Sequence, residues 1–155
     1  MNKRVSISEL VPIFEEILDS GGSVSFTPRG TSMLPMLSDG TDTVVLKKPE
    51  GKLRKYDLPL YFRKITKKYI LHRVVSIEKN GTYTMCGDNQ LAREYGVRDE
   101  DIVGVVTSFT HNGKTVSVDE FSYKFYCRKI VFKKRIRWHC SYFKRKIINF
   151  LKRFK

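Results

Sequence analysis

The stretch YILHRVVSIEKNGTYTMC, residues 69–86, carries the pattern that decides the fold. β-branched and aromatic residues dominate both of its ends, which is typical of strands. Between the two ends stands Asn80-Gly81, a pair that readily adopts the positive φ angles of a tight hairpin turn. We therefore predict two antiparallel strands, 69–78 and 83–86, joined by this turn.

Similar short runs, separated by Gly, Pro, Asp and Asn, extend outward from this hairpin in both directions. They predict further strands at residues 24–27, 43–47, 58–63, 102–110 and 115–118. A second Asn-Gly pair, Asn112-Gly113, predicts another hairpin. Pro59 cannot donate a backbone hydrogen bond, so its strand is expected at a sheet edge or at a bulge.

A helix is expected before the first strand, at residues 6–19. Ser6 and Glu9 form a capping box, and apolar residues then recur at helical spacing. They are Leu10, Ile13, Phe14, Ile17 and Leu18. Residues 1–120 are thus predicted to form one mostly β domain of the α+β class, with this amphipathic helix packed on it.

The charge separates the last 35 residues from this domain. The chain of 155 residues has 30 basic and 16 acidic residues, a net charge of +14. Thirteen of the basic residues and none of the acidic ones lie in 121–155, which leaves 17 against 16, or +1, in 1–120. Apolar residues in this tail recur every three or four positions, which predicts a basic amphipathic helix. They are Phe132, Ile136, Cys140, Phe143, Ile147, Phe150, Leu151 and Phe154.

Such a helix fits an anionic membrane surface, where basic side chains meet headgroups and apolar ones lie beneath them. Two other interpretations are open: the tail binds nucleic acid, or its apolar face covers the β domain. No run of about 18 apolar residues is present, nor is a secretory signal sequence. We expect a cytoplasmic protein, peripheral at the inner face of the cell membrane.

The three cysteines, Cys86, Cys127 and Cys140, are odd in number and lack CxxC spacing. This pattern indicates neither a disulfide framework nor a structural zinc site. We expect no metal and no cofactor.

Three segments carry candidate chemistry. Residues 30–37, GTSMLPML, form a loop that presents Ser32; the predicted strand 69–78 contains His72; and Gly87-Asp88-Asn89 marks a bend that holds a carboxylate. Each has an ordinary structural explanation when taken alone: a loop serine, a packed histidine and a capping aspartate.

Together and in this order, the segments resemble the signal peptidase superfamily of serine peptidases, which also includes the self-cleaving SOS-type repressors. The resemblance covers about Thr27 to Phe109. It rests on four boxes: Ser32-Met33-x-Pro35 with Asp39-Gly40 and Val44-Val45; Leu71-His72-Arg73-Val74-Val75; Gly87-Asp88-Asn89; and Asp101-Ile102-Val103-Gly104 with Val105-Val106.

The resemblance implies a coiled β-sheet peptidase domain. It implies that Ser32 is the nucleophile and that His72 is the general base, as in the His-containing branch of the family. Asp88 matches the Gly-Asp-Asn aspartate of that branch, and Glu94 stands where the branch has a further Asp. Residues of the substrate loop would be Gly30, Thr31, Met33 and Pro35, with the Ser32 N–H in an oxyanion hole.

These roles are chemically reasonable. A neutral imidazole can accept the serine proton, and a carboxylate on its other nitrogen would orient it; Asp88 is the first candidate and Glu94 the second. Ala92 is the only alanine, so the chain has neither an Ala-x-Ala site nor an Ala-Gly bond, and we expect a precursor or leader peptide cut in trans. Two alternatives stay open: a non-catalytic peptide- or membrane-binding module of the same fold, and a repressor-like DNA-associated regulator.

Overall fold

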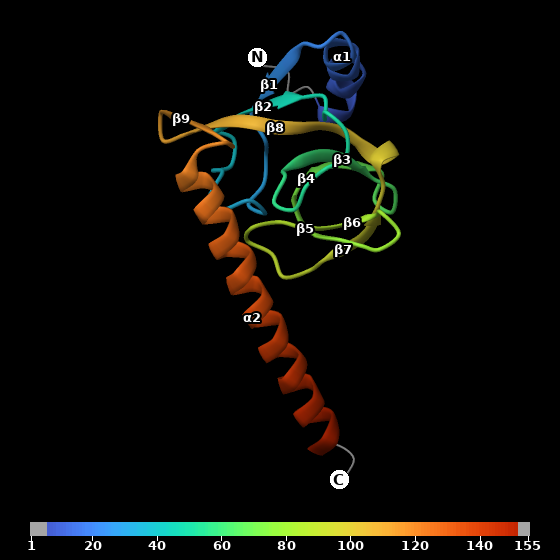
Figure 1. The fold of residues 1–155 in the computed structure, drawn as a ribbon, viewed down its shortest axis with the longest axis vertical. Helices are drawn as coiled ribbons and strands as arrows, with labels where there is room; N and C mark the ends of the chain where they lie inside the picture. The colour runs from blue at the N-terminus through green and yellow to red at the C-terminus, as the bar shows by residue number, and fades with distance from the viewer. Residues whose placement is uncertain (1–5, 152–155) are drawn as a thin grey trace.

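A computed structural model describes residues 6–151 (Figure 1). Over this range the chain is α+β, with two long helices and two antiparallel sheets that do not close into a barrel. The elements in chain order are α1 (Ile7–Asp19), β1 (Ser23–Phe26), β2 (Thr43–Lys47), β3 (Pro59–Arg63), β4 (Lys68–Leu71), β5 (Arg73–Ile77), β6 (Tyr83–Cys86), β7 (Glu94–Val97), the 3-10 turn η1 (Asp99–Asp101), β8 (Ile102–His111), β9 (Lys114–Ser117) and α2 (Phe121–Leu151).

The larger sheet has the order β1-β2-β8-β3-β4, with β9 paired to β8. Strand β3 therefore lies inside the sheet, so of the two expectations for Pro59 the edge strand is wrong, and the bulge is the one that the β3–β8 register supports. The proline is tolerated because it is the first residue of the strand, and the β3–β8 register shifts directly after it, between Leu60 and Tyr61.

The smaller sheet has the order β5-β6-β7. The predicted strand 69–78 is in fact two strands, because the chain leaves the larger sheet after Leu71 and enters the smaller sheet at Arg73. His72 is the single residue between them. Because His72 lies between the two sheets and not within one strand, its imidazole can contact residues of both.

Helix α1 begins as predicted, since Ser6 Oγ accepts a hydrogen bond of 3.3 Å from the Glu9 N–H. The residues it buries in the core are Val11, Phe14 and Leu18. Ile13 and Ile17 stay more than one-third exposed, so the face that packs is rotated from the one the apolar spacing favoured.

Helix α2 begins at Phe121, where the basic tail was expected to start. Its first half packs on the β domain through Tyr123, Cys127, Val131 and Lys134, which are all buried. Trp138 still contacts the domain through a hydrogen bond to the Leu91 carbonyl, and the C-terminal end of the helix projects beyond the sheets (Figure 1). Within residues 6–151, no helix is long and apolar enough to cross a membrane.

Candidate functional site

Ser32 lies in a tight turn that follows β1. The turn is anchored because Met33, Met36 and Leu37 are buried in the main core, and the Leu37 N–H donates to the Met33 carbonyl at 3.1 Å. Ser32 itself is half-buried. Apolar neighbours thus fix the backbone while the hydroxyl remains at the surface of a cavity.

The other residues of this loop shape its backbone. Gly30 has a φ angle of 107°, a conformation that favours glycine, and its N–H donates to Asp39 Oδ1 at 2.8 Å. The Thr31 carbonyl accepts a hydrogen bond of 3.2 Å from Asn89 Nδ2. Pro35 is exposed on the outside of the turn. Within residues 6–151, no hydrogen bond uses the Ser32 N–H.

The Gly87-Asp88-Asn89 bend brings the serine loop and His72 together. The Asn89 N–H donates to the Ser32 carbonyl at 2.8 Å. A Cβ atom at residue 87 would lie 2.7 Å from that same carbonyl oxygen and 3.0 Å from His72 Nε2. Only glycine therefore fits between the two, and His72 Nε2 faces the serine loop.

The other imidazole nitrogen faces Tyr61. The Tyr61 hydroxyl lies 3.5 Å from His72 Nδ1 and donates a hydrogen bond of 2.6 Å to Glu94 Oε2. Because its hydrogen is committed to Glu94, the phenol oxygen can only accept from His72. This arrangement favours the tautomer with hydrogen on Nδ1, which leaves Nε2 as the proton acceptor.

Glu94 is held in place by Arg63. The guanidinium Nη2 and Nε lie 2.6 and 2.7 Å from Glu94 Oε2. Burial and the Glu94 hydrogen bond raise the pKa of the Tyr61 hydroxyl, so Tyr61 stays protonated and keeps its donor role. Glu94 thus reaches His72 through Tyr61 instead of touching it.

His72 is only 4% exposed. Burial is the largest effect on the imidazole, followed by the charge of Arg63, and together they lower the pKa of His72 to about 4, against the opposing charges of Glu94 and Asp88. The imidazole is therefore neutral throughout the physiological range, which is the state a general base requires.

We expect a pH titration followed by NMR to show the His72 imidazole protonating at about 4, well below the usual value near 6.5. Arg63→Met removes a positive charge that lowers the pKa of His72, so the midpoint should move to higher pH. Arg93→Met, in the same cleft, is the matched control and should move it less. A His72 midpoint near 6.5 in the unmodified protein would show that the burial effect is absent.

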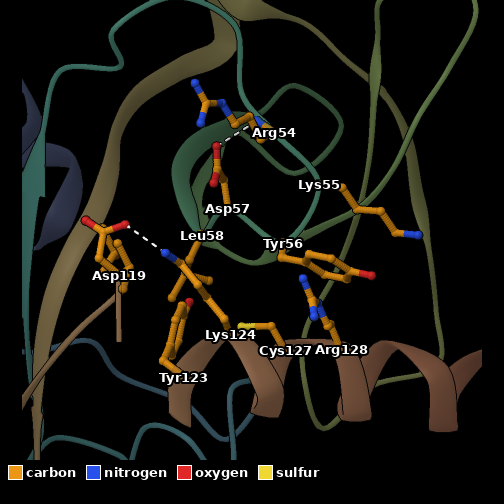
Figure 2. A pocket seen from close by; sticks show the side chains of 12 residues that line it. Arg54, Lys55, Tyr56, Asp57, Leu58, Asp119, Tyr123, Lys124, Cys127 and Arg128 are labelled. Atoms are coloured by element: carbon orange, nitrogen blue, oxygen red, sulfur yellow. Dashed lines mark hydrogen bonds and ion pairs between the residues drawn. The ribbon is translucent and has the colours of Figure 1, made fainter. Parts of the chain in front are cut away.

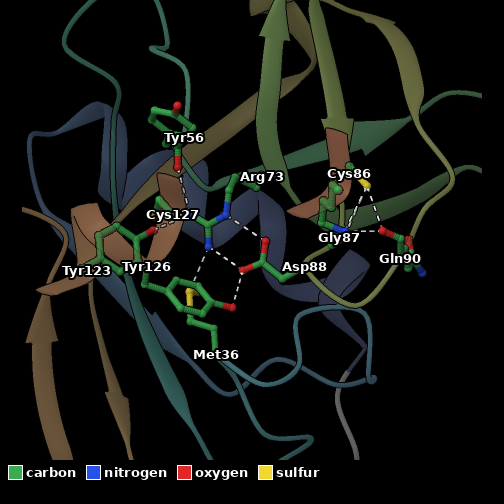
Figure 3. A network of polar contacts seen from close by, with 11 residues as sticks. Met36, Tyr56, Arg73, Cys86, Gly87, Asp88, Gln90, Tyr123, Tyr126 and Cys127 are labelled. Carbon is green, nitrogen blue, oxygen red and sulfur yellow. Dashed lines mark hydrogen bonds and ion pairs between the residues drawn. The ribbon is translucent and has the colours of Figure 1, made fainter. Parts of the chain in front are cut away.

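Among the described residues, no hydrogen bond joins Asp88 to His72. Arg73 Nε and Nη2 donate to the two Asp88 oxygens at 2.8 and 2.6 Å, and Tyr126 donates to Asp88 Oδ2 at 3.1 Å (Figure 3). Both partners of this ion pair have fully buried side chains. Asp88 is thus paired with Arg73, and Glu94 is the carboxylate that is linked to His72, through Tyr61.

Arg73 joins four parts of the chain. Besides Asp88, its guanidinium donates to the Tyr56 carbonyl at 3.0 Å, to Tyr123 Oη at 2.9 Å, to Cys127 Sγ at 2.8 Å and to Met36 Sδ at 3.0 Å (Figure 3). Tyr123 and Cys127 belong to α2, and Met36 to the serine loop. The ion pair therefore ties helix α2 and the serine loop to the same point.

Lys134 of α2 stabilises the Gly87-Asp88-Asn89 bend. Its ammonium group is buried and donates to the Gly87 carbonyl at 2.7 Å and also to the Gln90 carbonyl. Four residues on, Trp138 Nε1 donates to the Leu91 carbonyl at 2.7 Å. The first half of the predicted tail is thus part of the framework behind the site.

Two cavities meet at His72. The smaller, of about 180 Å³, is lined by Ser32 and His72 together with residues of β4. The larger, of about 760 Å³, extends from His72 along residues 90–95. His72, Arg63 and Gln90 line both cavities, so the imidazole stands where one continues into the other.

The structure therefore brings Ser32, His72 and, through Tyr61, Glu94 to one place. Sequence reasoning missed Tyr61, Arg63 and Lys134. Tyr61 and Arg63 alternate along one strand, which places them on one sheet face. Nothing local to the sequence shows that this face meets His72, because the meeting depends on the β3–β4 pairing.

No cluster of three or more His, Cys, Asp or Glu side chains that could hold a metal ion occurs in the part of the chain that the structure describes. No protein-family model matches the chain, and no curated protein matches it either.

Proposed function

We propose that the protein is a serine endopeptidase of the signal-peptidase type that hydrolyses a peptide bond in a precursor or leader peptide, and that its two sheets correspond to the coiled sheet of that family. One observation carries the proposal. Ser32 and His72, forty residues apart in sequence, line one cavity with His72 Nε2 facing the serine loop. The far nitrogen of the same imidazole contacts Tyr61, which is tied to a carboxylate.

In the acylation step, His72 Nε2 accepts the proton of Ser32 Oγ as that oxygen bonds to the carbonyl carbon of the substrate. The carbonyl oxygen becomes negatively charged, and the free Ser32 N–H donates to it. One such donor contributes about 3 kcal/mol to transition-state stabilisation. The protonated imidazole then gives its proton to the leaving nitrogen, and the C–N bond breaks.

Water reverses these roles in deacylation. His72 Nε2 takes a proton from water, the hydroxide bonds to the acyl carbon, and Ser32 Oγ leaves with the proton returned by the imidazole. Tyr61 and Glu94 stabilise the imidazolium in both steps, because a positive charge on His72 strengthens the hydrogen bond from Nδ1 to the phenol oxygen. Arg63 opposes this charge, which makes the Glu94 carboxylate necessary.

Among the described residues, no hydrogen bond joins Ser32 Oγ to His72. Catalytic hydrogen bonds are often long before substrate binds and shorten in the complex. The Ser32 backbone is held by Asn89, whose N–H donates to the Ser32 carbonyl at 2.8 Å, and on this proposal a χ1 rotation of the serine side chain brings Oγ to the imidazole. We expect the substrate, by filling the small cavity, to favour that rotamer.

The sheet edge offers a route for an extended peptide. Strand β4 ends the strand order of the larger sheet, and its residues Tyr69, Ile70 and Leu71 line the small cavity beside Ser32. A peptide paired to this edge would present its carbonyl to Ser32 and continue into the larger cavity. The substrate is then selected by its ability to extend, with side chains filling the two cavities.

Labelling with a fluorophosphonate probe tests the proposal, because the activated serine oxygen displaces fluoride from phosphorus and stays attached. We expect the label on Ser32 in the wild-type chain at pH 7.5, located by peptide mass spectrometry. Ser32→Ala and His72→Ala should lose it, while Ser25→Ala, an exposed serine of β1, should keep it. Wild-type labelling no faster than that of Ser32→Ala would overturn the proposal.

The same experiment separates the non-catalytic alternative. A module that only grips peptide would bind extended peptides from a library without cleaving them and would not react with the probe. Cleavage of library peptides that stops in Ser32→Ala supports the peptidase.

A further inference from the structure

Helix α2 has two apolar faces, of which only one packs on the protein. The inner face, which includes Tyr123, Cys127 and Val131, is buried against the β domain. The opposite face carries five large apolar side chains that are 49–81% exposed, called here the outer stripe: Phe121, Phe125, Phe132, Ile136 and Phe143. At 100° per residue these five fall within a sector about 60° wide. The outer stripe therefore forms one line along the helix.

This outer stripe includes the residues on which the sequence pattern depended. Phe132, Ile136 and Phe143 belong to the apolar pattern for which a membrane, a nucleic acid and the β domain were the three interpretations. Each of the three is at least 49% exposed, so the β domain does not cover them. Cys140, another expected member, is exposed but lies outside the outer stripe. The members at 147, 150 and 151 have no described side chains, and residue 154 lies outside the described range.

Basic side chains border the outer stripe on both sides. At helical spacing Arg128, Arg135 and Lys146 lie along one border, and Lys129 and Lys133 lie along the other. All five are exposed. The segment 121–155 contains no acidic residue, so nothing within it neutralises this charge.

A second segment of the chain adds to the same surface. Lys55 and Tyr56, from the loop before β3, join Phe125, Phe132, Arg128 and Arg135 around a hollow of about 500 Å³. Figure 2 shows Lys55, Tyr56 and Arg128 beside the neighbouring pocket of about 280 Å³, to which Arg54 also contributes. Positive charge from two separate segments thus surrounds the apolar line.

We propose that the outer stripe docks helix α2 on an anionic phospholipid surface. The phenylalanine and isoleucine side chains enter the bilayer below the headgroups, and the bordering lysines and arginines meet the lipid phosphates. Docking in this way leaves the inner face, the β domain and the cavities at His72 on the aqueous side.

The composition of the face favours lipid over other occupants. A second copy of the chain would place two acid-free segments, each with 13 basic residues, against one another. A nucleic acid would pair with the basic residues but would leave the four phenylalanines and the isoleucine of the outer stripe in water or against phosphates. A bilayer with anionic headgroups satisfies both the charge and the apolar line.

Flotation of the full chain with lipid vesicles tests this. We expect binding to vesicles of phosphatidylcholine with 30% phosphatidylglycerol, and at least tenfold weaker binding to pure phosphatidylcholine. Phe125→Ser/Phe132→Ser/Phe143→Ser should weaken binding to the anionic vesicles at least tenfold. The matched control is Ile13→Ser/Ile65→Ser, which removes apolar side chains that are 54% and 92% exposed elsewhere; it should bind as the wild type does.

The charges are tested separately with Arg128→Gln/Lys129→Gln/Arg135→Gln, for which each lost charge should weaken binding about fivefold. Circular dichroism of every variant checks that the fold is kept. Equal binding to neutral and anionic vesicles, or an outer-stripe variant that binds like the wild type, overturns the proposal. So does binding to duplex DNA, or dimer formation, that depends on the outer stripe while anionic vesicles stay unbound.

Discussion

Asp88→Ala is expected to lower the free energy of unfolding by about 3–5 kcal/mol, the usual cost of removing one partner from a buried ion pair. The variant leaves the Arg73 guanidinium fully buried with no counter-ion, and it also removes the acceptor for Tyr126. Arg73 ties the serine loop and α2 together, so both should loosen. Urea unfolding followed by circular dichroism measures the loss.

Two further variants separate this effect from an ordinary loss of a charge pair. Asp119→Ala breaks the exposed pair with Lys124 and should cost less than about 1 kcal/mol. Arg73→Met combined with Asp88→Leu should recover part of the stability, because the largest penalty comes from the unpaired charge. If Asp88→Ala left stability unchanged but slowed Ser32 labelling, Asp88 would be an orienting residue after all.

His72→Ala is expected to lower the second-order rate constant for fluorophosphonate labelling of Ser32 by about 10⁴-fold, since loss of the base leaves the serine hydroxyl protonated. Tyr61→Phe should lower it only about fivefold, the equivalent of one neutral hydrogen bond of about 1 kcal/mol. The smaller effect is expected because Tyr61→Phe removes only the hydroxyl group, and packing still holds the His72 imidazole in place.

Labelling rates at pH 7.5, with unfolding curves for each variant, measure both effects. Glu94→Gln provides the comparison, because it keeps the size of the side chain and removes the charge that stabilises the imidazolium. A His72→Ala chain that labels as fast as the wild type would mean that another group activates Ser32, and Lys134 would be the first to examine.

Local patterns in the sequence account for most of the secondary structure. Runs of β-branched and aromatic residues predict β1, β2, β3, β6, β8 and β9 within one residue, whereas β4 and β5 were predicted as one strand. The two Asn-Gly pairs lie in the turns expected of them. Strand β7 was missed because Glu94–Val97 contains a glycine and a charged residue and buries only Val97. The break at His72 was missed because both flanking strands have the same strand-forming composition.

The candidate site divides in the same way. Motif order indicated Ser32 and His72, and the structure places both beside one cavity. The partner of His72 could not be chosen from spacing, since Asp88 and Glu94 stand in one short segment. Arg73 follows His72 directly in the sequence, and its side chain pairs with Asp88. The Tyr61 hydroxyl, which lies beside His72, donates to Glu94 instead.

The sequence by itself determined the β domain, the leading helix and the basic helix, because propensity, turn residues and charge act over a few neighbouring positions. Only the tertiary structure decided which face of each helix is buried, which carboxylate is linked to His72 through Tyr61, and where the described part of the tail leaves the domain. The physical reason is that both faces of α2 are apolar enough to pack, and both carboxylates are near enough to pair. The choice of helix face and the choice of carboxylate both depend on contacts with residues far away in the chain, chiefly Arg73 and Tyr61.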